Sequence, residues 1–178
     1  MYKEIIGDIF ENVKDKKMSG VFYGQCISND FAMGAGIAKQ FNKYFNTKSR
    51  LLSKKAEYDS YCKKYYNKDL FVTRIIDDYR FSQVGKVILV DNVFCLITKE
   101  KYYEKPTLKT FTKTIESLYD KIDFELAFKN LRIMELRVPM LGCGLDKLNW
   151  KDVKPILIKL SERLDKLDID LIVYIKNG

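Results

Sequence analysis

Apolar residues with two different spacings divide this chain into strands and helices. Short runs rich in β-branched and aromatic residues predict strands, at residues 2–6, 21–27, 71–76, 84–98, 131–140 and 169–175. The run over 84–98 is interrupted by Asp91-Asn92, so it predicts a hairpin, with Lys99 at its end. Helical spacing predicts helices between the strands, after Gly36, over 51–65, from Pro106-Thr107 and from Asn149.

Two of the predicted helices have a well-defined apolar face. One face contains Leu108, Phe111, Ile115, Leu118 and Ile122, and the other contains Val153, Ile156, Leu157, Leu160 and Leu164. Asn149 is a candidate N-cap of the last helix, and Pro155 falls near its first turn, where proline is tolerated. Strands that alternate with helices predict an α/β fold, a mixed β-sheet sandwiched between helical layers, with a ligand at the carboxyl ends of the strands.

Two glycine-containing loops each join a predicted strand to a predicted helix, at Gly34-Ala35-Gly36 and at Gly142-Cys143-Gly144. Glycine lets the backbone approach a ligand closely and turn its N–H groups toward phosphate oxygens, and the helix N-terminus adds a positive dipole. Two such loops suit a ligand with more than one phosphate. The alternative for each is a tight turn without a ligand. Neither loop matches GxxxxGK[ST] or GxGxxG, which disfavours an ATPase or a classical dehydrogenase.

Length and composition predict one domain over residues 1–178. The chain is 47% hydrophobic, which suffices for a sizeable core. It contains no apolar stretch of about 20 residues and begins with polar residues, so we expect a cytoplasmic protein that is not bound to a membrane. Its four cysteines are widely spaced without a CxxC pair, so we expect reduced, mostly buried thiols and no zinc site.

The sequence contains no histidine, which removes the usual general base and the commonest transition-metal ligand. Any catalysis must therefore rest on carboxylates, lysines or tyrosines. No clustered carboxylates indicate a metal site, and no cofactor is expected. The net charge of +8 favours polyanionic partners such as nucleotides or nucleic acid, although the lysines are scattered and acidic residues lie between them.

Several blocks of the sequence, in order and spacing, resemble the macrodomain family of ADP-ribose-binding α/β proteins. Within that family they are similar to the branch of the terminal ADP-ribose protein glycohydrolase and its bacterial DNA-directed relatives. The MGAGIA and GCGLD motifs, with a tryptophan after the second, are the most specific part of the match. The blocks lie at residues 7–10, 26–41, 96–99 with 106–107, 139–150 and 173–174.

The resemblance implies an ADP-ribose site. It implies that Asp8 binds the adenine amino group with Ile9 beside it, and that the two glycine loops hold the diphosphate and the distal ribose from opposite sides. A simple turn residue is the alternative for Asp8. The ligand-binding residues implied in this way are Asp8, Ile9, Ser28, Met33, Gly34, Ala35, Gly36, Ile37, Thr98, Leu141, Gly142, Cys143, Gly144, Leu145 and Tyr174.

The same resemblance implies that Lys99 and Asp146 are catalytic. The lysine amine would attack the anomeric carbon of the distal ribose, and the aspartate would move protons. An amine is a competent nucleophile once it is deprotonated, so this chemistry needs no histidine. The alternatives are a solvated Lys99 and an Asp146 that only precedes or caps a helix. For Cys143, a small buried side chain is favoured over a nucleophile.

We therefore expect a hydrolase that removes mono-ADP-ribose from glutamate or aspartate carboxylates of modified proteins and also deacylates O-acyl-ADP-ribose. Its expected partners are ADP-ribose and mono-ADP-ribosylated protein, and we expect a monomer. The alternatives are a DNA ADP-ribosyl glycohydrolase of antitoxin type, with ADP-ribosylated DNA as partner, and a non-catalytic ADP-ribose reader. The segment over about 46–83 departs from the compact family pattern and is expected to be an insertion.

Overall fold

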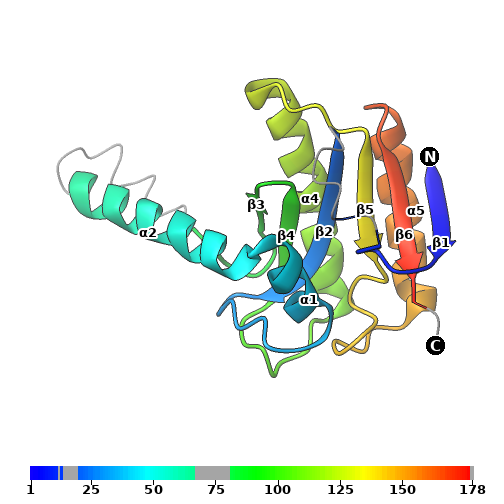
Figure 1. Cartoon of the computed structure of the whole chain (residues 1–178), viewed down its shortest axis with the longest axis horizontal. Coiled ribbons are helices and arrows are strands. Elements are labelled where there is room, and N and C mark those ends of the chain that lie inside the picture. Colours follow the sequence, from blue (N-terminus) through cyan, green and yellow to red (C-terminus); the bar gives the residue numbers. More distant parts are fainter. Residues whose placement is uncertain (12, 14–19, 67–80, 177–178) are drawn as a thin grey trace.

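The computed structural model describes residues 1–11, 13, 20–66 and 81–176. Strands and helices alternate along the chain as predicted (Figure 1). The predicted strand at residues 71–76 lies outside the described residues. The elements are β1 (Tyr2–Ile6), β2 (Val21–Ser28), α1 (Gly36–Phe45), α2 (Thr47–Tyr65), β3 (Val87–Val90), β4 (Val93–Lys99), α4 (Leu108–Lys129), β5 (Glu135–Pro139), α5 (Trp150–Asp165) and β6 (Asp170–Ile175).

The strands form one six-stranded sheet in the order β1-β6-β5-β2-β4-β3. The edge strand β3 is antiparallel to β4, which confirms the predicted hairpin, and all other neighbours are parallel. The sheet is therefore mixed, as expected. Because parallel strands point the same way, the carboxyl ends of β1, β2, β4, β5 and β6 meet at one edge of the sheet, where ligands bind in open α/β folds.

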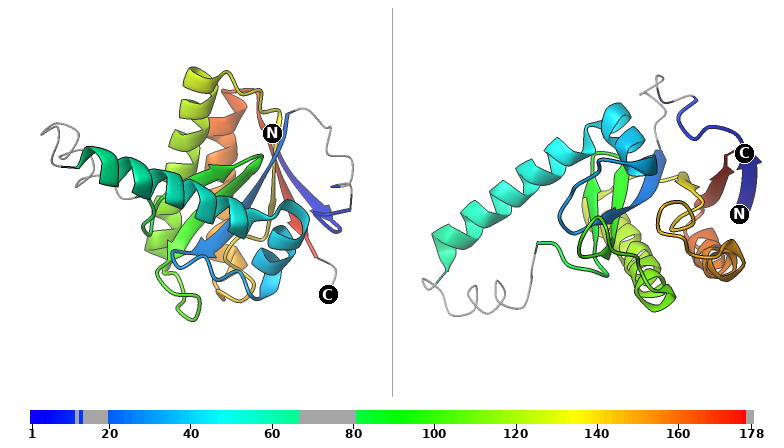
Figure 2. Two further views of the ribbon diagram at one scale, coloured as in Figure 1. Left: turned by 60° about the vertical axis from the view of Figure 1, so that its left-hand side comes forward. Right: turned by 90° about the horizontal axis from the view of Figure 1, so that it is seen from below.

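Helices cover both faces of the sheet, as Figures 1 and 2 show. Along β4, Phe94 and Leu96 pack into the core beneath α4 and α5, whereas Cys95 and Ile97 pack into the core on the side of α1. Successive side chains of a strand point to opposite faces of the sheet. The sequence of a strand that is covered on both faces is therefore a continuous apolar run. This explains why strand β4 shows no polar alternation.

Three predicted details were wrong. Leu108 is 40% exposed, so it does not share the burial of the later apolar residues on its face of α4. The predicted strand at 131–140 is shortened to Glu135–Pro139, because the backbone N–H of Leu131 still caps α4 by donating to the Glu125 carbonyl. Pro155 is the sixth residue of α5 and so lies in its second turn.

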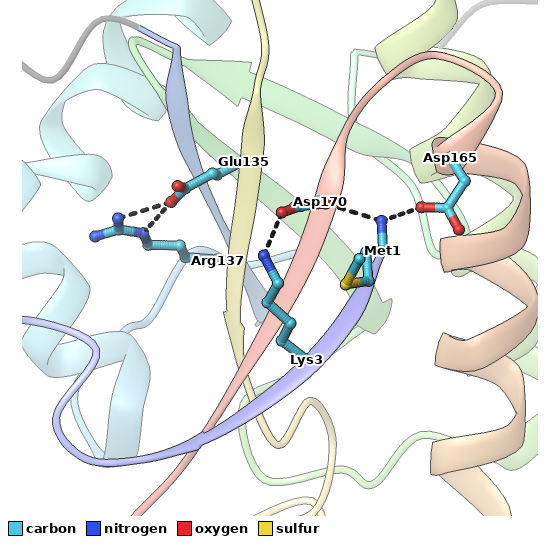
Figure 3. Close-up of polar contacts among 6 residues, drawn as sticks. All are labelled: Met1, Lys3, Glu135, Arg137, Asp165 and Asp170. Atoms are coloured by element: carbon cyan, nitrogen blue, oxygen red, sulfur yellow. Dashed lines mark hydrogen bonds and ion pairs between the residues drawn. The ribbon is translucent and has the colours of Figure 1, made fainter.

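Ion pairs connect the edge strand β1, and the Met1 amino group before it, to β6 and α5 (Figure 3). Asp170 of β6 accepts hydrogen bonds from the Met1 amino group at 2.9 Å and from Lys3 Nζ at 2.6 Å. The Met1 amino group also pairs with Asp165 of α5. Such half-exposed pairs each contribute little stability. The register of β1 is that of its parallel pairing with β6, which places residues 7–8 at the ligand edge of the sheet.

The helix predicted over residues 51–65 is present as α2, which extends away from the sheet (Figure 2). Only Thr47 and Leu51 of this helix are buried. That the segment over about 46–83 is an insertion stays a prediction. None of the helices in the described part of the chain is long and apolar enough to cross a membrane.

Candidate active site

Four strand ends and the loops after them surround one cavity of about 910 Å³. Ser28 ends β2, Lys99 ends β4, Pro139 ends β5, and Tyr174 is the penultimate residue of β6; all four line the cavity. The site thus lies at the carboxyl edge of the parallel strands, where the sequence placed it. A concave site of this size is typical of small-molecule binding.

The first glycine loop forms one wall of this cavity, from Met33 to Ile37. Gly36 has a φ of +59°, and a Cβ there would lie 2.8 Å from Leu145 Cδ1 of the opposite loop. Helix α1 begins at Gly36, and no side chain caps its N-terminus. Its first N–H groups are therefore available to an anion at the positive end of the helix dipole. That this loop binds an anion stays a prediction.

The second glycine loop, from Leu141 to Leu145, forms the facing wall. Gly142 has a φ of +71°, and a Cβ there would lie 2.8 Å from Leu148 Cδ1, so the turn requires glycine. Gly144 has open space around it. The N-terminus of α5 differs from that of α1, because Asn149 caps it as predicted by accepting a hydrogen bond from the Lys151 N–H. The N-terminus of α5 thus offers an anion fewer free N–H groups than that of α1 does.

Lys99 and Asp146 form an ion pair inside the cavity. Lys99 Nζ lies 2.5 Å from Asp146 Oδ1, and each side chain is only 12% exposed. Lys99 is therefore not the solvated lysine of the alternative interpretation. Asp146 does not cap α5, since Asn149 has that role. Lys99 ends β4 and Asp146 lies in the loop between β5 and α5, and the parallel sheet brings them together.

A register shift between β2 and β4 places Lys99 beside Ser28. Ile27 pairs with Ile97, but Ser28 pairs with Lys99, so Thr98 is the extra residue. Such bulges often lie next to active sites and re-aim the side chain that follows. Thr98 itself is buried and does not line the cavity, and its Oγ1 has no hydrogen-bond partner among the described residues.

Two thiols line the cavity, those of Cys26 and Cys143. Burial raises the pKa of Cys143 to about 11, and burial with the nearby Asp146 charge also raises the pKa of Cys26. Both thiols are therefore protonated at neutral pH and are poor nucleophiles. The expectation of mostly buried thiols was wrong, because only Cys95 is fully buried while Cys26, Cys62 and Cys143 are partly exposed.

Three predicted ligand-binding residues, Asp8, Ile9 and Thr98, lie outside the cavity lining. Asp8 is an exposed turn residue whose Oδ1 accepts a hydrogen bond from the Phe10 N–H at 3.0 Å, and Ile9 packs in the core. Both follow β1, whose partner β6 contains Tyr174, so they lie at the same edge of the sheet. Their contact with a ligand stays a prediction. The other predicted residues, which line the cavity, are Ser28, Met33, Gly34, Ala35, Gly36, Ile37, Lys99, Leu141, Gly142, Cys143, Gly144, Leu145, Asp146 and Tyr174.

Sequence reasoning missed the loop after β4. Tyr102, Tyr103, Glu104 and Lys105 line the cavity beside Lys99. No motif marks this segment, and its only signal is its position between the predicted strand and the Pro106-Thr107 helix start. Asp30 was also missed, although its carboxylate contacts Ser28 and the Tyr102 loop. Within the residues that the structure describes, no group of three or more acidic or cysteine side chains lies together to hold a metal ion.

Comparison with known proteins identifies relatives of this chain. No protein-family model matches it. The human protein named ADP-ribose glycohydrolase OARD1 is 29% identical over 168 residues, which are 94% of this chain and 87% of that protein. The bovine protein of the same name is 31% identical over 149 residues, which are 84% of this chain and 78% of the relative.

Solved structures share the fold. The macrodomain of Mycobacterium tuberculosis DarG has a TM-score of 0.63 at 21% identity and covers 98% of this chain and 97% of its own. Thermosipho africanus DarTG, solved in complex with ADP-ribose, has a TM-score of 0.61 at 19% identity and covers 98% of this chain and 41% of its own. The sequence identity to the bovine relative, together with the shared fold, shows that the chain belongs to the macrodomain family, in the branch of the ADP-ribose glycohydrolases.

Proposed function

We propose that this protein removes single ADP-ribose units from glutamate or aspartate carboxylates of modified proteins, with Lys99 as nucleophile and Asp146 as the proton-transfer group. The general reaction, hydrolysis of an ADP-ribosyl linkage, is supported by the relatives named ADP-ribose glycohydrolase. The observation that carries the finer proposal is the ion pair between Lys99 Nζ and Asp146 Oδ1, 2.5 Å long and 12% exposed at both ends.

The contact between the two groups supplies a direct route for the proton that must leave the lysine. Asp146 takes a proton from the Lys99 ammonium, and the neutral amine attacks the anomeric carbon of the distal ribose. The bond from that carbon to the acceptor oxygen breaks, and the acceptor leaves as a carboxylate. Asp146 passes its proton to the departing carboxylate and is thereby a base again. It then deprotonates a water that attacks the same carbon, the carbon–nitrogen bond breaks to release the neutral Lys99 amine, and Asp146 returns the proton to that amine, which restores the ion pair. O-acyl-ADP-ribose offers the same type of carboxylate leaving group.

The walls of the cavity suit the rest of the ligand. The diphosphate is expected to bind at the uncapped N-terminus of α1, next to Gly34–Gly36, because backbone N–H groups at a helix N-terminus favour phosphate oxygens. The second glycine loop is assigned the other side of the diphosphate and the distal ribose. The adenine is expected to bind next to Tyr174, with Asp8 and Ile9 on the neighbouring connection after β1. A ligand in this orientation places its distal ribose next to Lys99.

A second candidate substrate is ADP-ribose on a DNA base, because the net charge of +8 favours a polyanion. The pocket and the nucleophile would be the same, and only the leaving group would differ. The similarity in fold to the DarG macrodomains is compatible with both substrates. The third possibility is a module that binds ADP-ribose without cleaving it. Such a module requires no nucleophile in the cavity, and the partly buried ion pair argues against it.

The experiment measures release of free ADP-ribose from a glutamate-modified protein and from a thymidine-modified DNA strand. It uses the native chain, Lys99→Ala, Asp146→Ala and, as a matched control, Lys101→Ala, which removes an exposed lysine outside the cavity lining. We expect release from the protein by the native chain and the control, and loss of release in the two cavity variants. Cleavage of the DNA alone would replace the proposed acceptor, and tight binding without cleavage of either substrate would indicate a reader.

A further inference from the structure

Ser28 lines the cavity, and the proton of its hydroxyl is engaged within the protein. It is the last residue of β2, lines the cavity, is 5% exposed and pairs in register with Lys99. Its Oγ donates a hydrogen bond to Asp30 Oδ1 at 2.5 Å. A serine hydroxyl has one proton and two lone pairs. Because the proton is used inside the protein, the lone pairs can only accept a hydrogen bond from a ligand.

Asp30 is itself held in place by three donors. Its Oδ1 also accepts a hydrogen bond from the Ala32 N–H at 3.3 Å, and its Oδ2 accepts one from the Tyr102 N–H at 3.1 Å. Loss of solvent around the carboxylate raises its pKa, but the hydrogen bonds from Ser28, Tyr102 and Ala32 outweigh this and hold the pKa of Asp30 below its usual value. The carboxylate therefore stays an acceptor at neutral pH, and the direction of the Ser28 hydrogen bond is maintained.

The same turn ties Ser28 to the loop that follows Lys99. The Asn29 N–H donates to the Lys99 carbonyl at 2.9 Å, and Asn29 Nδ2 donates to Glu100 Oε2 at 2.8 Å. With the bond from the Tyr102 N–H to Asp30, these contacts join the β2–α1 turn to the start of the β4–α4 loop. Ser28 Oγ is thereby placed relative to the residue that we assign as nucleophile.

We propose that Asp30 is a positioning residue that orients the Ser28 hydroxyl to accept a hydrogen bond from a hydroxyl group of the reacting ribose. The inference rests on the proposed function, since that function places the distal ribose beside Lys99. Phosphate oxygens accept hydrogen bonds and so cannot pair with this serine, whereas the ribose hydroxyls can donate. This contact turns the anomeric carbon toward Lys99 and selects a ribose over a deoxyribose at the reacting position.

The test measures binding by calorimetry, so it does not depend on hydrolysis. The ligands are ADP-ribose and its analogues that lack the 2-hydroxyl or the 3-hydroxyl of the distal ribose. The proteins are the native chain, Ser28→Ala, Ser28→Thr, Asp30→Asn and the double variant Ser28→Ala/Asp30→Asn. Ser53→Ala is the matched control, because it removes an exposed serine hydroxyl on α2, outside the cavity lining. Circular dichroism checks that each variant is folded.

We expect Ser28→Ala to bind ADP-ribose about threefold to tenfold more weakly, which is the contribution of one neutral hydrogen bond. One of the two deoxy analogues should show no further loss in this variant, and Ser28→Thr should retain native affinity. Asp30→Asn replaces one acceptor oxygen with an amide donor, which must oppose either Ser28 and Ala32 or the Tyr102 N–H, so this variant should weaken binding to a similar degree. The double variant should be no worse than Ser28→Ala.

The proposal is overturned when Ser28→Ala weakens ADP-ribose and both deoxy analogues equally, or when Asp30→Asn binds like the native chain. The experiments distinguish failure of this positioning proposal from failure of the proposal that Lys99 is the nucleophile. If Lys99→Ala still releases ADP-ribose while the coupling between Ser28 and a ribose hydroxyl persists, the nucleophile is wrong and the positioning role stands. If Lys99→Ala is inactive and no coupling is found, the nucleophile stands and the positioning role is wrong.

Discussion

Two glycines of the second loop should respond in opposite ways to the same added methyl group. Gly142 adopts a φ of +71°, and its Cβ would lie 2.8 Å from Leu148 Cδ1 and 3.5 Å from the buried Phe111. Gly144, two residues away, has no atom within 4 Å of the Cβ position and lines the cavity. We predict that Gly142→Ala lowers the stability of the fold, whereas Gly144→Ala spares the fold and weakens ADP-ribose binding.

The magnitude follows from the backbone and the contact. Alanine in the left-handed region costs about 1–2 kcal/mol, and the lower entropy of the unfolded chain offsets about 0.4–1 kcal/mol of this cost. Moving the Leu148 side chain adds overpacking strain of about 1 kcal/mol. The net loss in the free energy of unfolding for Gly142→Ala is thus about 1–3 kcal/mol. For Gly144→Ala we expect a change within about 0.5 kcal/mol.

Urea denaturation of the native chain and both variants measures these differences, because a lower midpoint with an unchanged slope reports stability alone. A thermal melt should place Gly142→Ala about 2–10 °C below the native chain for a domain of this size. Calorimetry with ADP-ribose completes the comparison. Equal midpoints for the two variants would refute the conformational argument, and native affinity in Gly144→Ala would show that the ligand does not approach this part of the loop.

Two further predictions concern stability. Thr107→Ala removes the hydroxyl that caps α4 by accepting from the Thr110 N–H and should cost about 1 kcal/mol, measured as a lower urea midpoint; an unchanged midpoint would show that the cap contributes nothing. Asp170→Asn removes a carboxylate whose pKa is lowered by Lys3 and by the Met1 amino group. The carboxylate therefore stabilises the fold fully at a pH above its pKa in the unfolded chain, and this stabilisation is lost as the pH falls through its pKa in the folded protein. The variant should therefore be less stable at pH 7, by under about 1 kcal/mol because the pair is partly exposed, and this difference should vanish near pH 2 in urea titrations.

The sequence was sufficient to predict the order of the described strands along the chain and both glycine loops, because strong periodicity and glycine spacing carry that information locally. It was also sufficient to single out Lys99 and Asp146 through the family resemblance. Their contact depends on the parallel pairing of β4, β2 and β5, which is a property of the folded sheet.

Other features of the site could not be read from the sequence. Thr98 is an extra residue only in relation to the pairing of β2 with β4, so no local sequence pattern predicts it. The bond from Tyr102 to Asp30 joins residues 72 positions apart, and neither lies in a periodic segment. The exposure of Leu108 was missed because helical spacing shows which residues share a face and does not show where a covering element ends.

The identity of the nucleophile is tested most directly by trapping the covalent intermediate. The native chain and Lys99→Ala are mixed with a glutamate-modified substrate, quenched at short times and digested, and the ADP-ribosyl adduct is located by mass spectrometry. The account predicts an adduct on Lys99 in the native chain and none in Lys99→Ala, which should also release no ADP-ribose. Undiminished release by Lys99→Ala, or an adduct located on another residue, would contradict it.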